Sequence, residues 1–95
     1  MSDLKTLDDY SKIDKLLAAR AKTHGEFSDH AFITQNIKYL MHASENWDNL
    51  SVSHKESLEM IAHKIGRILA GDPNFPDHWD DGAGYFTLGS KACKP

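Results

Sequence analysis

The chain has 95 residues, of which 26% are charged and 40% apolar, a composition typical of a folded globular domain. Its 14 acidic residues outnumber the 11 lysines and arginines, which argues against neutralisation of the phosphates of duplex DNA. No apolar run approaches the ~20 residues that span a bilayer, and the first residues contain no signal-peptide core. We therefore expect one α-helical domain, residues 1–95, in the cytoplasm and without a membrane partner.

Helical periodicity dominates the chain, and the first predicted helix covers about residues 8–22. Its apolar side chains recur at helical spacing: Ile13, Leu16, Leu17 and Ala21. Gly25 is expected to end this helix, and Ser28 to cap the next one. The apolar face of the second helix is Phe32, Ile33, Ile37, Leu40 and Met41. Residues 44–49 are expected to form a loop, with Trp47 folded back onto the core.

The third predicted helix has the clearest start and end. Ser53 and Glu56 have the spacing of a capping box, although Ser51 is a rival cap. The apolar arc of this helix is Leu58, Ile61, Ala62, Ile65, Ile68 and Leu69. Gly71 is expected to close the helix.

A fourth helix is expected to begin near Pro76 or Asp77 and to reach about Lys91. The side chains expected to face the core are Trp79, Ala83 and Phe86. The helix also contains Gly82, Gly84 and Gly89, which favour the close approach of another backbone. Four helices with short connections predict an all-α bundle.

A polar stripe runs along the third helix, because Glu56, Glu59, His63 and Arg67 are separated by 3, 4 and 4 residues. Two carboxylates one turn apart can share a divalent cation, and Arg67 and His63 can meet phosphate oxygens. The stripe lies nearly opposite the apolar arc, so a solvated face is the plainer interpretation. The alternative is a functional face that a second subunit covers.

Two further parts of the sequence contain candidate binding residues. Asp81 lies too deep in its helix to act mainly as a partner of the helix dipole, so it is a candidate metal ligand or an anchor for a lysine or arginine. A basic segment that ends in glycine suits phosphate, although helix C-termini are often basic for other reasons: Arg20, Lys22, Thr23, His24 and Gly25. No His-x-x-x-His pair is present, so no zinc cofactor is expected.

Three motifs occur in order along the chain: Arg20-x-x-x-His24-Gly25, Lys64-x-x-Arg67 followed by Gly71-Asp72-Pro73, and Trp79-x-Asp81-x-Ala83-Gly84-Tyr85. In these motifs the chain resembles a family of small phage and prophage proteins of unknown function. The resemblance covers roughly residues 13–92, and Gly82 stands where the family more often has an aliphatic residue. It implies a compact α-helical protein from a virus or prophage, acting in the infected bacterium, with no established activity to transfer.

A more distant similarity links the chain to all-α nucleoside triphosphate pyrophosphohydrolases of the MazG type. These enzymes carry Glu-x-x-Glu on one helix and Glu-x-x-Asp on the next, which together hold Mg²⁺. Glu56-Ser57-Leu58-Glu59 matches the first half. The second half is degraded, since the helix register favours His78-x-x-Asp81 and one carboxylate is lost.

Three functions from different classes remain open. The first is a non-catalytic nucleotide-binding protein, which sequesters a nucleotide or a host defence signal and needs no cofactor. Its ligand-binding residues would be Lys22, His24, Lys64, Arg67, Trp79, Asp81 and Tyr85. The cations would meet the phosphates, an aromatic ring would stack on the base, and Asp81 would hold one cation in place.

The second function is a Mg²⁺-dependent pyrophosphohydrolase, with Glu56, Glu59 and Asp81 as the metal ligands. The third is an inhibitor that binds a host protein through its acidic surface and Trp47. Either nucleotide function predicts a homo-oligomer, because a bundle this small offers little concave surface.

Overall fold

The computed structural model describes residues 7–94, which form four α-helices and one turn of 3₁₀ helix with no strand among them. The elements are α1 (Leu7–His24), α2 (Phe27–Ala43), η1 (Trp47–Asn49), α3 (Val52–Ala70) and α4 (Pro76–Lys91). The predicted all-α bundle of four helices is confirmed. Within this range no helix has both the length and the hydropathy to cross a bilayer. The N-terminal segment, where we expect no signal-peptide core, lies outside the described residues.

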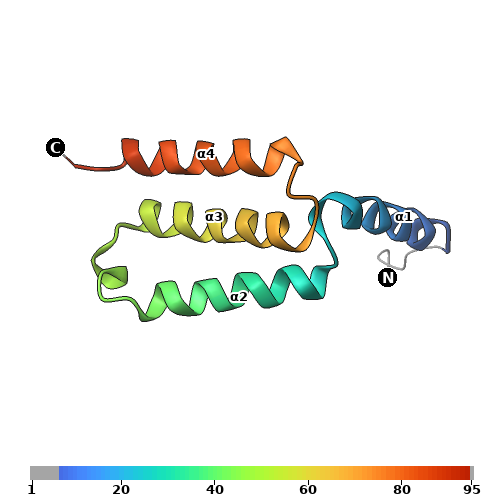
Figure 1. Ribbon diagram of the computed structural model, residues 1–95, viewed down its shortest axis with the longest axis horizontal. Helices are drawn as coiled ribbons and strands as arrows, with labels where there is room; N and C mark the ends of the chain where they lie inside the picture. The colour runs from blue at the N-terminus through green and yellow to red at the C-terminus, as the bar shows by residue number, and fades with distance from the viewer. Residues whose placement is uncertain (1–6, 95) are drawn as a thin grey trace, which may run out of the picture.

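Three of the helices form a flat layer. α2, α3 and α4 lie side by side with α3 in the middle and with each neighbour running in the opposite direction, whereas α1 projects beyond one end of the layer (Figure 1). The molecule measures 53 × 38 × 24 Å along its principal axes. The central helix therefore has packed neighbours along two edges, and its two remaining sides form the faces of the layer.

The helix ends match the sequence predictions in part. Gly25 has φ of 78°, a left-handed conformation that glycine adopts without steric cost, and it ends α1 as predicted. Gly71 ends α3, donating its N–H to the carbonyl of Arg67. The rival cap Ser51 is the true N-cap of α3, since its hydroxyl accepts from the His54 N–H, and the Ser53 capping box is wrong. Ser28 is also wrong as a cap, because α2 begins one residue earlier, at Phe27.

The edges of α3 are packed through small and polar side chains. The buried residues of this helix are Ser57, Ile61, Ala62, Lys64 and Gly66. On the α2 side, Thr34 is the one buried residue of α2, and it lies against Gly66. On the α4 side, Lys64 forms an ion pair with Asp81 at 3.0 Å. The helices therefore approach each other through small and polar residues, and these contacts bury little apolar surface.

The predicted apolar faces are only partly buried. Among the described apolar residues only Ile61 and Ala62 are buried, and Leu69, on the predicted arc of α3, is 66% exposed. The prediction that Trp79, Ala83 and Phe86 face the core is wrong, since all three are exposed. The physical reason is the layer itself, because a helix packed only along its edges leaves the arc between them uncovered.

The glycines of α4 do not have the predicted role. A Cβ atom added at Gly82 or Gly84 would meet nothing within 4 Å, and one at Gly89 would make only ordinary contacts with Ser57 and His54. The close backbone approaches occur instead at Gly25 and Gly71, where an added Cβ would collide with the carbonyl groups of Ala70 and Thr23. At Gly66 an added Cβ would collide with side chains of α2, meeting the Thr34 hydroxyl and lying 2.7 Å from His30 Cδ2.

Gly66→Ala and Gly84→Ala should therefore change stability in opposite directions. We expect Gly66→Ala to destabilise the fold by about 1–3 kcal/mol, because the new methyl group overpacks the α2–α3 contact. Gly84→Ala should stabilise it by about 0.5–1 kcal/mol through helix propensity alone. Urea unfolding followed by circular dichroism measures both, and a Gly66→Ala variant as stable as Gly84→Ala would contradict this packing.

Candidate functional site

The end of α1 is joined to the turn between α3 and α4 through one carbonyl. The Thr23 carbonyl accepts hydrogen bonds from the backbone N–H of Asp72 at 3.0 Å and from His78 Nε2 at 2.9 Å. His78 is only 2% exposed, and its ring packs edge-on against His24 at 4.7 Å between centroids. This joint fixes where the basic end of α1 lies relative to α3.

A cavity of about 470 Å³ lies beside this joint, where α1, α2 and α3 meet. It is lined by Leu17, Arg20, Ala21, His24, Gly25, Glu26, Phe27, His30 and Arg67. Arg20 and His24 stand one turn apart on α1, whereas Arg67 comes from the last turns of α3. We call this cavity the basic pocket, because its lining contains two guanidinium groups, those of Arg20 and Arg67, and a single carboxylate, that of Glu26.

The N-terminus of α2 also opens at the basic pocket. Glu26 occupies the N-cap position and makes no side-chain capping bond, and Gly25 and Phe27 on either side of it line the cavity. The first backbone N–H groups of a helix have no partner within the helix, and the helix dipole makes this end favourable for anions. The pocket thus combines guanidinium groups with backbone donors that no side chain caps.

The histidines in and beside the basic pocket have lowered pKa values. Burial lowers the pKa of His24, and the charge of nearby Arg67 lowers it further. The same two causes, in the same order, lower the pKa of His30. Burial followed by the charge of Lys38 lowers the pKa of His63, whose ring lies 5.7 Å from that of His30. All three imidazoles are therefore mainly neutral at pH 7.

The structure brings together only some of the predicted ligand-binding residues. His24 and Arg67 share the basic pocket, whereas Lys22 is exposed and is not among its lining residues. Lys64 is buried in its ion pair with Asp81. Anchoring a cation was one of the two roles left open for Asp81, and this is the contact that the carboxylate makes.

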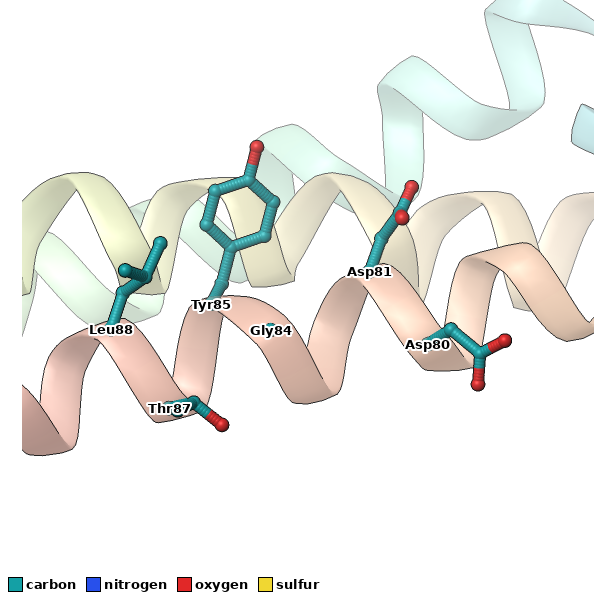
Figure 2. A pocket seen from close by; sticks show the side chains of 6 residues that line it. All are labelled: Asp80, Asp81, Gly84, Tyr85, Thr87 and Leu88. Atoms are coloured by element: carbon teal, nitrogen blue, oxygen red, sulfur yellow. The ribbon is translucent and has the colours of Figure 1, made fainter.

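Asp81 and Tyr85 line a different cavity, of about 550 Å³, together with Asp80, Gly84, Thr87 and Leu88. Figure 2 shows the side chains of Asp81, Tyr85 and Leu88 projecting to the same side of α4, while Asp80 and Thr87 point away from it. This cavity shares no lining residue with the basic pocket. Trp79 lines neither cavity, and its indole N–H donates to the Pro73 carbonyl at 2.8 Å.

The three tentative metal ligands do not converge. Glu59 is hydrogen-bonded to His42 at 2.8 Å, Asp81 is paired with Lys64, and Glu56 is exposed. Across the described part of the chain, no three histidine, cysteine, aspartate or glutamate side chains are grouped closely enough to hold a metal ion. The polar stripe of α3 is divided in the same way, because Glu59 contacts α2 of the same chain and Arg67 faces the basic pocket.

Comparison with known proteins adds no family to this geometry, since no family model, no curated protein and no solved structure matches the chain. The site must therefore be interpreted from its own residues.

Sequence reasoning missed part of the basic pocket. Phe27 and His30 received no role, and Arg20 was considered only within the basic segment. Their spacing carried the missing signal, because Phe27 and His30 stand three residues apart, directly after the predicted turn at Gly25. Residues one turn apart at the start of a helix face the same side, and here that side is the pocket.

The lowered histidine pKa values predict that acid destabilises the fold. Because His24, His30 and His63 have folded pKa values below their usual 6.5, the unfolded chain binds more protons than the folded chain between those values and 6.5. The free energy of unfolding should therefore fall as pH is lowered from 7 to 5, and level off above 6.5. Urea unfolding across this range measures the slope, which His63→Gln should reduce. A stability that stays constant from pH 7 to 5 would contradict the burial of these rings.

Proposed function

We propose that this chain binds a nucleotide in the basic pocket without turning it over. The observation that carries the proposal is the convergence of Arg20 and Arg67 with His24 and His30 around one cavity at the start of α2. Two arginines that are distant in sequence and meet at an uncapped helix N-terminus form a typical site for phosphate groups.

The phosphates would bind between the two guanidinium groups. Guanidinium donates paired hydrogen bonds to phosphate oxygens, and the uncapped N–H groups of α2 add further donors. His24 and His30 take up protons more readily once an anion lies beside them, because the negative charge offsets the influence of Arg67. The site therefore strengthens its own positive charge when a phosphate binds.

The base would stack on Phe27. This ring lines the pocket, is 79% exposed, and lies edge-on to His30 at 6.1 Å between centroids. An exposed aromatic ring at the rim of a cationic pocket offers a stacking surface that any base can use. It replaces Trp79 and Tyr85 in the proposal, because both of these lie outside the pocket.

The candidate metal-binding carboxylates are scattered, which favours nucleotide binding without turnover over hydrolysis. A Mg²⁺-dependent pyrophosphohydrolase needs several oxygen ligands directed at one ion, whereas Glu59 and Asp81 are engaged with His42 and Lys64. The host-protein inhibitor has less support, since Trp47, its expected anchor, is half-buried with its ring 4.6 Å from that of His42. Sequestration of a nucleotide or of a nucleotide defence signal remains the function that we propose, in keeping with the resemblance to phage proteins.

Arg67→Ala should weaken nucleotide binding, because it removes a charged donor from the phosphates. We expect the dissociation constant for ATP to rise about 10- to 100-fold, corresponding to the loss of about 1.5–3 kcal/mol from one charged hydrogen bond. Isothermal titration calorimetry with ATP, ADP and cyclic dinucleotides as probes measures this change. Lys91→Ala, in the last turn of α4, is the matched loss of an exposed cation away from the basic pocket.

Two results would contradict the proposal. Equal ATP affinity in Arg67→Ala and Lys91→Ala would show that the basic pocket does not hold the phosphates. Nucleotide binding itself would be contradicted if no probe gives a heat of binding and millimolar nucleotide leaves the melting temperature unchanged.

A further inference from the structure

The layer of α2, α3 and α4 has one face that is mainly apolar. Leu40 of α2, Leu69 of α3 and Phe86 of α4 are 67%, 66% and 62% exposed. Ile65 and Trp79 are exposed large side chains of the same helices. Each helix thus contributes apolar surface that the described part of the chain leaves open to solvent.

Helix geometry places these side chains on a common face. Leu58, Ile65 and Leu69 follow one another at spacings of 7 and 4 residues, so they share one side of α3. Leu58 and Phe86 line the same cavity between α3 and α4. Phe86 also stands on nearly the opposite side of α4 from Leu88, two residues further on, which places it on the side of Leu58. On α2, Leu40 lies on the flank that turns away from His42, whose imidazole bonds Glu59.

The opposite face of the layer is charged. Glu56 and Arg67 lie on the side of α3 away from Leu58 and Leu69, and Asp81 bonds Lys64 from the corresponding side of α4. Because Arg67 lines the basic pocket, that pocket belongs to the charged face. The two faces of the layer are therefore chemically distinct, and a partner on the apolar face would leave the pocket open.

The amount of exposed surface is large for one chain. The chain exposes 7269 Å², whereas a folded monomer of 10.7 kDa exposes about 5,500 Å². The Cα radius of gyration is 16.6 Å, against about 12 Å for a compact domain of this length. The excess is about 1,800 Å², and each partner in a standard interface buries ~800 Å².

We propose that a second copy of this chain covers the apolar face, so that two layers of helices enclose one core. Folded domains are built from at least two packed layers, and the described residues of one chain supply a single layer. The apolar face can pair with itself about a twofold axis, since the exposed side chains named on it carry no charge that would repel its copy. This inference does not rest on nucleotide binding, because it concerns the face opposite the pocket.

Light scattering coupled to size-exclusion chromatography tests the proposal directly. The wild-type chain should elute at about twice 10.7 kDa, and Leu69→Asp should raise the dissociation constant of the dimer at least tenfold. Leu88→Asp is the matched control, because Leu88 is 57% exposed but lines the cavities on the charged side of α4. Its effect on the dimer should be less than twofold.

A wild-type chain that stays monomeric at 100 µM with a cooperative melt would overturn the proposal, as would equal effects of Leu69→Asp and Leu88→Asp. If Leu69→Asp does not fold, the melting temperature of the wild-type chain is the deciding measurement. A melting temperature that rises over a hundredfold increase in chain concentration supports the dimer, because dissociation then accompanies unfolding. A melting temperature that stays constant overturns the proposal. Neither readout involves nucleotide, so failure here is distinct from failure of the proposed function.

Discussion

The Thr23 carbonyl is the contact on which the arrangement of this molecule depends. It lies at the end of α1, where helix carbonyls lack partners within the helix, and it accepts both the Asp72 N–H and His78 Nε2. Because His78 is buried beneath His24, this pair of hydrogen bonds ties α1, the turn before α4, and α4 itself into one joint. The basic pocket lies beside that joint, so the joint holds α1, with Arg20, next to the end of α3 that carries Arg67.

The packing of α3 determines how the remaining surface is divided. Gly66 on one edge and Ser57 on the other let α2 and α4 approach closely without a large apolar core. A layer held together by its edges has two free faces. The charged face carries the basic pocket and the Lys64–Asp81 ion pair, while the apolar face is available for a second layer. The proposed ligand site therefore lies on the charged side, where α1 meets α2 and α3, and the proposed self-association uses the opposite face of α2, α3 and α4.

The sequence alone predicted the four helices and several of their ends, because periodicity, Gly25, Gly71 and the Pro76 start are local signals. It could not predict which arcs become buried. Trp79 and Phe86 look like core residues on a helical wheel, and only the layer arrangement shows that the described chain leaves their face largely exposed. Burial of His78 depends on a carbonyl 55 positions away, which no local pattern encodes.

The candidate site could likewise be predicted only where its residues are neighbours in the sequence. The segment from Arg20 to Gly25 suggested phosphate from its composition, and His24 does lie in the pocket. Its partners Phe27, His30 and Arg67 come from two other helices, so their meeting depends on the tertiary fold. Asp81 was predicted to bind a metal or to anchor a lysine or arginine, and only the fold shows that its partner is Lys64.

Native mass spectrometry of the wild-type chain with ATP, with mononucleotides and with cyclic dinucleotides tests the central claim most directly. The account predicts an assembly of two chains or a multiple of two, carrying nucleotide of unchanged mass whether or not Mg²⁺ is present. Bare protein with every nucleotide would contradict binding in the basic pocket. A bound product lighter by pyrophosphate, formed only with Mg²⁺, would contradict binding without turnover.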